Sequence, residues 1–504
     1  MFSSVSSGTL FGMSVYPVQV EADMSDGMPM FELVGYLAGE VKEARERVRT
    51  ALRNSGYRLP PKRITVNLSP ADRRKKGTSF DLPIAVALLK AMEALPDHCT
   101  DGMMITGELS LSGHVKGVRG VLAMVMEAKR NGFRRCIVPM QNVREGSVVQ
   151  GIEVYGVCSL AQTAALLKGN EFPVIQEIPE EEPENEGKDV RYDFADIRGQ
   201  KVLKRALEIA VSGNHNILLI GPPGAGKSMA AGCLPGILPC LTKEERMEVT
   251  KIYSIAGMLS GTGLVTARPF ISPHHSVSAQ ALAGNGASPG LVSLAHRGVL
   301  FLDELPEFNR AALEIMRQPL EEKEIRISRV NGNYVYPADF MLAAAMNPCK
   351  CGYYPDLSRC RCSDTQIGAY LSRISRPLLD RIDICVEASR IRMKELKSQK
   401  REETSEKVQQ RVEAVRNLQR ERLKESNIFC NGAMGQKDIA RYCILGKSEE
   451  RLMESAYDRL GLTVRAYHKI LRVSRTIADM DGEERIREKH LCEAIGYREI
   501  AGIF

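Results

Sequence analysis

Apolar positions recur along the chain with different spacings. Residues 41–52 place them at helical spacing and residues 64–68 alternate them, which predicts a helix followed by a half-buried strand. Farther on, the continuous apolar runs 216–220, 298–302 and 341–346 predict buried strands of a parallel sheet. Over roughly the last hundred residues the apolar positions recur every three or four residues, which predicts helices without strands. The expected fold class is multidomain α/β, with an α+β N-terminal part, an α/β core and an all-α end.

Composition predicts where these parts divide. Residues 177–189 read EIPEEEPENEGKD and contain six Glu, one Asp and two Pro, so they bury too little apolar surface to offset ordering. We interpret this stretch as an acidic linker. The chain then divides into a domain at 1–176, an α/β core at 190–390 and a helical lid at 391–504. A length of 504 residues, 44% of them hydrophobic, is sufficient for about three such units.

Charge and cysteine usage exclude some classes of protein. No apolar run approaches the roughly 20 residues of a membrane helix, and the N-terminal residues carry no basic region typical of a signal peptide. Nine of the thirteen cysteines are scattered singly, which favours a reducing compartment over a disulfide framework. We therefore expect a cytoplasmic protein. The net charge of +7 permits a nucleic-acid partner without requiring one.

The strongest motif follows the first of the buried strands. It is a complete G-x-x-x-x-G-K-S, and its glycines allow successive backbone N–H groups to surround phosphate oxygens. Lys227 is expected to reach the β- and γ-phosphates, and Ser228 to bind Mg²⁺. The motif predicts a nucleoside triphosphate site. Its residues are Gly221, Pro222, Pro223, Gly224, Ala225, Gly226, Lys227 and Ser228.

The next two apolar runs end in side chains that serve nucleotide hydrolysis. The run 298–302 is followed by Asp303, expected in the Mg²⁺ shell, and by Glu304, expected to polarise the attacking water. The run 341–346 is followed by Asn347, whose amide could orient water near the γ-phosphate. The alternative for Asn347 is an amide that only caps a turn.

Arg381 occupies a predicted helix-to-strand junction in the sequence LLDRID. One interpretation is an arginine finger, which enters a neighbouring subunit's site and stabilises charge on the transferring phosphoryl group. A finger of this kind requires an oligomer with a closing, head-to-tail interface. The other interpretation is an ion pair within the chain, to Asp380 or Asp383.

Four cysteines have the spacing of a metal site. They form two C-x-C pairs separated by eight residues, and four thiolates are a ligand set of structural zinc. The alternatives are reduced free thiols or a redox sensor. The four are Cys349, Cys351, Cys360 and Cys362. His274 and His275 are adjacent to each other but distant in sequence from the cysteines. We interpret them as loop or pore surface and not as metal ligands.

The N-terminal part is locally basic. Residues 41–79 hold twelve Lys or Arg against three acidic residues, including the run Arg73, Arg74, Lys75 and Lys76. A solvated surface is one explanation of this charge. Contact with DNA phosphates is the other, and it would make binding strongly salt-dependent.

Together these motifs resemble the AAA+ ATPases of the magnesium-chelatase-like group, and most closely the bacterial ComM/YifB family. The resemblance implies a helix-2 insertion at 252–297. Alternation around Asn-Gly at 325–336 predicts a hairpin on physical grounds, and the resemblance implies that its Arg326 and Arg329 face a central pore. The resemblance also implies that Arg465 is the sensor-2 arginine of the lid, leaves Arg376 as a rival to Arg381, and adds weight to zinc at the four cysteines.

The N-terminal part resembles the domain of Lon-type proteases. Ser79 occupies the position of their nucleophile, which needs a lysine to accept its proton. Aligned on Gly107-Glu108, that lysine's position is occupied by Leu122, and Lys116 would require a different register. We therefore expect a Lon-like domain without protease activity, and no proteolytic substrate.

For function, the resemblance implies a homo-hexameric ring that uses ATP and Mg²⁺, with structural Zn²⁺. The implied partner is single-stranded or branched DNA, with no membrane. The implied role is branch migration of recombination intermediates during natural transformation or homologous recombination. The alternatives are a magnesium-chelatase-type motor subunit and a protein-remodelling ATPase.

Overall fold

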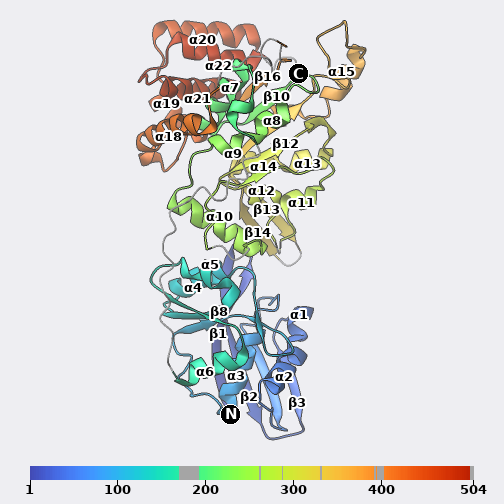
Figure 1. Ribbon diagram of the computed structural model, residues 1–504, viewed down its shortest axis with the longest axis vertical. Coiled ribbons are helices and arrows are strands. Elements are labelled where there is room, and N and C mark those ends of the chain that lie inside the picture. The colour runs from blue at the N-terminus through green and yellow to red at the C-terminus, as the bar shows by residue number, and fades with distance from the viewer. Residues whose placement is uncertain are drawn as a thin grey trace.

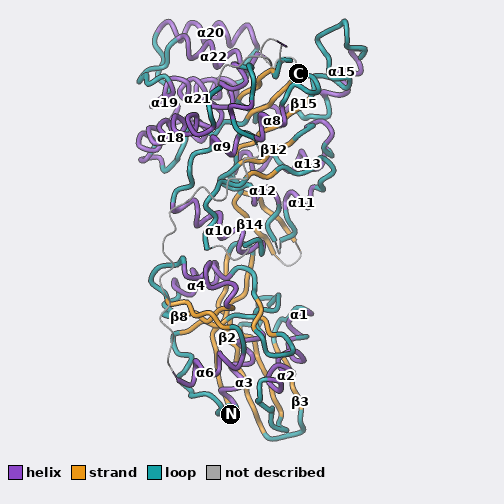
Figure 2. The backbone as a smooth tube through the Cα atoms, viewed as in Figure 1, coloured by secondary structure: helices purple, strands orange, loops and turns teal. Residues whose placement is uncertain are grey.

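The computed structural model describes residues 1–169, 192–259, 263–286, 288–329, 332–390, 393 and 402–499. Two parts follow one another along the long axis of the molecule: an N-terminal domain and a larger C-terminal part with its own sheet (Figure 1). Strands cluster in both parts, whereas the end of the chain is helical (Figure 2). The predicted linker at 177–189 lies outside the described residues.

The N-terminal domain is built on a seven-stranded mixed sheet of order β3-β4-β2-β1-β5-β8-β9. Its strands alternate buried side chains between two cores, as Met103 and Ile105 of β5 join the core under α2 and α3 while Met104 joins the core under α4. The strands are β1 Phe2–Phe11, β2 Ser14–Ser25, β3 Met30–Val34, β4 Arg63–Ser69, β5 Met103–Ile105, β8 Arg135–Pro139 and β9 Glu153–Val157, with a separate pair β6 Glu108–Leu109 and β7 Val115–Lys116. The helices are α1 Gly39–Lys42, α2 Ala44–Asn54, α3 Asp81–Ala91, α4 Val121–Arg130, α5 Val143–Ser147 and α6 Leu160–Gly169.

The core of the C-terminal part is a parallel sheet of order β11-β12-β15-β10-β16. Side chains of β10 alternate: Ile217 and Leu219 face one core, and Leu218 and Ile220 face the other. The strands are β10 Ile217–Ile220, β11 Phe270–Ile271, β12 Val299–Leu302, β15 Met341–Met346 and β16 Ile384–Glu387, and the antiparallel hairpin is β13 Glu324–Arg329 with β14 Gly332–Pro337.

Helices cover both faces of this sheet and continue into a helical lid. The core helices are α7 Lys201–Gly213, α8 Lys227–Gly232, α9 Leu234–Ile237, α10 Lys243–Ala256, α11 Ala279–Ala283, α12 Leu291–Leu294, α13 Arg310–Ile315, α14 Arg317–Glu322, α15 Asp364–Leu371 and α16 Arg376–Leu379. The lid helices are α18 Ser405–Arg422, α19 Gln436–Tyr442, α20 Lys447–Leu460, α21 Val464–Met480 and α22 Glu488–Glu499. Within the described part of the chain, every helix is too short or too polar to serve as a membrane span.

One expectation from the sequence needs correction, and one lid helix departs from a simple apolar pattern. The interval 252–297, expected as an insertion, contains β11, the edge strand of the core sheet, so the interval as a whole is not an insertion. Two residues are too short a strand for periodicity to detect. In α18, residues 408, 412, 415 and 419 share one helical face, which is buried. Gln419 on this face is therefore fully buried, whereas Leu418 beside it is 48% exposed.

The N-terminal domain packs against the C-terminal part through α4 and α10. The N–H of Gly120 donates to the carbonyl of Ser254 at 3.0 Å, and the Ser254 hydroxyl donates to the buried carboxylate of Glu145. A second contact joins the β1–β2 turn to the hairpin, where Phe11 stacks on Tyr334 with ring centroids 4.5 Å apart.

A buried ion pair joins the lid to the core sheet. The Lys469 ammonium of α21 lies 3.0 Å from a carboxylate oxygen of Asp383, just before β16, and both side chains are about nine-tenths buried. Burial alone would raise the pKa of Asp383, but the charges of Lys469 and His215 outweigh burial and lower it. Burial lowers the pKa of Lys469 to about 8 against the opposing pull of Asp383.

We predict that Asp383→Ala lowers the free energy of unfolding by about 3–5 kcal/mol, because it leaves Lys469 buried and unpaired. Adding Lys469→Met should recover much of this loss in a double-mutant cycle measured by denaturant unfolding. Because the fold lowers the pKa of Asp383, the contribution of this carboxylate to the free energy of unfolding is complete above its unfolded pKa of about 4. That contribution is lost as the pH falls below this value. Additive losses in the cycle would contradict this assignment.

Candidate functional site

Three neighbouring parallel strands end at one cavity. The phosphate-binding loop (residues 221–228) follows β10, Asp303 and Glu304 follow β12, and Asn347 follows β15, which lies between these strands. Their side chains therefore meet at the carboxyl edge of the sheet. The cavity has a volume of about 360 Å³ and is lined by Pro223, Gly224, Ala225, Gly226, Lys227, Ser228, Met229, Asp303, Glu304, Met346 and Asn347.

The phosphate-binding loop has a backbone that only some residues can adopt. Gly224 and Gly226 have φ angles of 75° and 83°, in the left-handed region that glycine enters without strain. This path turns the loop around Lys227, whose side chain is buried. The ammonium donates to the carbonyls of Gly221 and Pro222 and to Oδ1 of Asn347, at 2.7, 3.0 and 3.0 Å.

Lys227 is thus surrounded by neutral oxygens. Burial lowers the pKa of this lysine, and the negative charges of Asp303 and Glu304 act in the opposite direction. A buried ammonium without a bonded anion is suited to bind an anionic ligand, and the glycine-rich loop supplies further N–H donors for phosphate oxygens.

The acidic pair lies beside the loop. The Ser228 hydroxyl donates to Oδ2 of Asp303 at 2.5 Å, which brings together two oxygen ligands of the type that Mg²⁺ prefers. Glu304 has a φ of 53°, unusual for a residue with a side chain, and its carboxylate lies 3.4 Å from Nδ1 of His275. His275 lies in a loop, as expected, and in addition contacts Glu304. No sequence signal linked it to Glu304.

Arg381, the predicted finger, and Arg465, the predicted sensor-2 arginine, share one carboxylate. Arg381 is 2.6 Å and Arg465 is 3.3 Å from Oε1 of Glu321, and neither lines the cavity of its own chain. Arg381 is therefore paired within the chain, but to Glu321 and not to Asp380 or Asp383. Arg376 is exposed at the start of α16, and among the described residues the structure gives it no ion pair.

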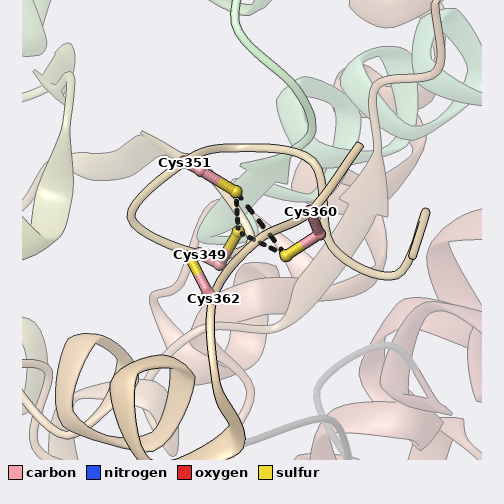
Figure 3. A group of neighbouring side chains, drawn as sticks. All are labelled: Cys349, Cys351, Cys360 and Cys362. Atoms are coloured by element: carbon pink, nitrogen blue, oxygen red, sulfur yellow. Dashed lines mark hydrogen bonds between the residues drawn. The ribbon is translucent and has the colours of Figure 1, made fainter. Parts of the chain in front are cut away.

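The four cysteines come together in one group directly after Asn347 (Figure 3). The sulfurs of Cys349, Cys351 and Cys360 are 3.4–3.7 Å apart, and Cys362 completes the group, with all four sulfurs within 4.8 Å of one another. Four thiolates at about 2.3 Å from a tetrahedral zinc would lie about 3.8 Å apart. The arrangement is compatible with zinc, whereas disulfides would require sulfurs about 2 Å apart.

The two arginines of the hairpin predicted to face a pore differ in their ion pairing. Arg326 lies 2.6 Å from Glu324 and 3.8 Å from Glu322, so its charge is largely balanced. Arg329 is exposed, and the described residues offer it no ion pair. Residues 330–331 at the tip lie outside the described residues.

The basic run beside the hairpin is less exposed than its composition indicates. Lys75 is fully buried and donates to the Pro70 carbonyl, whereas Arg73 and Arg74 are exposed. Lys76 reaches the Tyr334 hydroxyl of the hairpin at 3.3 Å.

The N-terminal domain shows no serine–lysine pair in its described residues. Ser79 is buried just before α3, and the structure gives no hydrogen bond from its hydroxyl to a lysine. Leu122 is fully buried in α4, and Lys116 is exposed on β7.

Comparisons with known proteins agree along nearly the whole chain. Three family models match: magnesium chelatase, subunit ChlI, at residues 193–396; subunit ChlI of Mg-chelatase at 20–142; and the ChlI C-terminal region at 402–498. The competence protein ComM of Haemophilus influenzae is 43% identical over 491 residues, which covers 97% of this chain and 95% of that protein. The uncharacterized protein YifB of Escherichia coli is 40% identical over 502 residues, covering 99% and 97%.

The likeness to Lon proteases is partial. The archaeal Lon protease of Methanocaldococcus jannaschii is 31% identical over 109 residues, or 22% of this chain and 16% of that protein. The nearly full-length matches, by contrast, span the nucleotide cavity, the four cysteines and the lid. The chain is a member of the ComM/YifB family of magnesium-chelatase-like AAA+ ATPases.

Proposed function

We propose that this chain is an ATP-driven motor that forms a ring and moves along DNA, acting as a branch-migration helicase on recombination intermediates. The observation that carries the ATP part is the cavity at which Lys227, Ser228, Asp303, Glu304 and Asn347 converge. The DNA part is supported by the similarity to a protein named for competence, the state in which cells take up DNA, and by the exposed arginines around the hairpin.

In this proposal, the five residues named above each have a part in hydrolysis. Lys227 binds the β- and γ-phosphates in place of its present carbonyl partners, and Asn347 is left to orient water. Ser228 and Asp303 would hold Mg²⁺, which neutralises charge on the phosphates. Glu304 accepts a proton from the attacking water, and His275 at 3.4 Å holds its carboxylate. The nucleotide lies between subunits, so that an arginine of the neighbour completes the site.

The DNA path in this proposal runs along the hairpin. Arg329 at the end of β13 and Arg73 and Arg74 of the N-terminal domain provide exposed charge, and the Lys76–Tyr334 contact holds the two regions together. Contacts of this kind bind DNA phosphates and give no preference for a DNA sequence.

We predict that Glu304→Gln lowers kcat for ATP hydrolysis by about 100-fold or more while nucleotide affinity is retained, because it removes only the proton acceptor. Lys227→Ala should abolish nucleotide binding. Both are measured with a phosphate-release assay and a fluorescent ATP analogue. Hydrolysis by Glu304→Gln at the wild-type rate would rule out this role for Glu304.

We predict that single-stranded DNA and a four-way junction stimulate ATP hydrolysis severalfold, and that stimulation declines with salt as bound counterions are released. Arg329→Ala should reduce the dependence of DNA affinity on log salt concentration by about one unit, the contribution of one phosphate contact. The matched control is Arg459→Ala, which removes an exposed lid arginine away from the hairpin.

An ATPase that is indifferent to every DNA tested would contradict the motor. It would favour a magnesium-chelatase-type or protein-remodelling role, consistent with the family models. Casein degradation by the purified chain would revive the protease alternative that Leu122 disfavours.

The arginine that acts in trans is identified by mixing inactive variants. Arg381→Ala and Arg376→Ala retain Glu304, whereas Glu304→Gln retains both arginines, so mixed rings contain some complete sites between neighbours. We predict that Glu304→Gln restores ATPase activity when mixed with the variant that lacks the finger. A finger variant must be inactive by itself and regain activity on mixing. If neither Arg381→Ala nor Arg376→Ala behaves in this way, neither residue acts in trans.

A further inference from the structure

The turn that carries the first two cysteines packs against the nucleotide cavity. The N–H of Gly352 donates to the carbonyl of Cys349 at 3.0 Å and closes this turn, in which Gly352 has a φ of 87°. A Cβ atom on Gly352 would lie 2.5 Å from Cδ of Pro223 and 3.7 Å from Cγ of Asn347. The turn therefore touches both the phosphate-binding loop and the amide that accepts a hydrogen bond from Lys227.

Little apolar burial holds this turn in place. Between Lys350 and Ser363, Gly352 is the only buried residue, and Leu357 is 81% exposed. A short segment without a core of its own depends on a cross-link for its shape, and a metal bound by four thiolates is one such cross-link. The four sulfurs are the feature that joins the two ends of this segment.

The second cysteine pair leads back to the same amide. Cys360 and Cys362 directly precede α15, whose first turn is capped by Ser363. Tyr370 of α15 is buried, which raises its pKa, and the Asn347 backbone acts on its hydroxyl to lower that pKa. The cysteine loop (residues 349–362) therefore begins just after Asn347 and leads into a helix that returns to it.

We propose that the cysteine loop, closed by a metal ion on its four thiolates, positions Pro223 and Asn347 for nucleotide binding, so that metal affinity and nucleotide affinity are coupled. This inference rests on the proposed nucleotide site and is independent of DNA. The closed loop holds Gly352 against Pro223 and keeps Asn347 within reach of Lys227. An open loop releases both contacts and leaves the cavity loosely shaped.

Coupling of this kind has a reciprocal consequence. If metal binding raises the affinity for nucleotide by some factor, nucleotide must raise the affinity for metal by the same factor. A loop that only stabilised the fold, without contacting the cavity, would not respond to nucleotide. Reciprocity therefore separates positioning from a purely structural role.

The first experiment removes the cysteine pair that is remote from the cavity. Full-length Cys360→Ser/Cys362→Ser is compared with wild type for bound Zn²⁺ and for affinity toward a fluorescent ATP analogue, without DNA. We expect loss of zinc and at least about tenfold weaker nucleotide binding, as for other residues that support a site indirectly. The control is Cys158→Ser, an exposed free cysteine in the N-terminal domain.

The second experiment disturbs the contact and leaves the ligands intact. Gly352→Ala should retain zinc but weaken nucleotide binding, because its Cβ displaces Pro223. Gly56→Ala is the matched control: its φ of 90° imposes a similar strain, and nothing lies within 4 Å of its added Cβ. This variant keeps the test decisive if the double cysteine variant fails to fold.

The third measurement is zinc transfer to a chelator with and without a non-hydrolysable ATP analogue. Slower and weaker transfer in the presence of nucleotide, lost in Lys227→Ala, is the expected result. Wild-type nucleotide affinity in folded, zinc-free protein would overturn the proposal. So would a chain that binds no zinc, or a zinc affinity that is the same with and without nucleotide. Failure of DNA to stimulate hydrolysis would leave it unaffected, whereas a wild-type chain that binds no ATP would refute the nucleotide site itself.

Discussion

The buried ammonium of Lys227 is the interaction on which the site depends. It is held by two carbonyls of its own loop and by Asn347, with no carboxylate bonded to it. Enclosing a cation among neutral oxygens is costly unless an anion arrives, so the cavity is built for phosphate before any phosphate binds. The same ammonium links the phosphate-binding loop to the strand β15 and, through Asn347, to the cysteine loop.

The parallel sheet makes this convergence possible. Because β10, β15 and β12 are neighbours and run in the same direction, the residues after each strand reach one edge. The lid is attached to the other end of this arrangement by the buried pair of Lys469 and Asp383. The lid is thereby tied to β16, which pairs directly with β10, the strand that leads into the phosphate-binding loop.

The local features of the site could be predicted from the sequence because each is written in contiguous residues. The strand before Gly221, the acidic pair after β12 and the spacing of the cysteines are of this kind. So is the existence of the hairpin at 325–336. Its register differs from that of a turn centred on Asn-Gly, because Arg329 pairs with Gly332.

The missed features depend on packing between distant segments. His275 meets Glu304 across about thirty residues of sequence, and Glu321 collects both Arg381 and Arg465 from separate elements. Lys75 belongs to a run that composition alone assigns to the surface, yet it is buried. Gly352 carried a weak signal, as a glycine directly after C-x-C, but its contact with Pro223 requires the fold.

An arginine pair held by one glutamate bears on the proposed ring. Arg381 and Arg465 are both engaged by Glu321 and both lie outside the cavity of their own chain. For either to reach a neighbour's nucleotide, the phosphates must compete with Glu321 for the guanidinium. In the proposed ring, assembly and nucleotide binding would then be linked through the same charges.

The proposed function requires that ATP hydrolysis in this cavity drives movement along DNA. Its most direct test is the conversion of a synthetic, mobile four-way junction into its duplex products by the full-length chain. A DNA motor of this kind should convert the junction with ATP and Mg²⁺, but not with ADP, with a non-hydrolysable analogue or with Glu304→Gln. A chain that hydrolyses ATP at full rate in the presence of the junction and leaves it unconverted would contradict the proposed function.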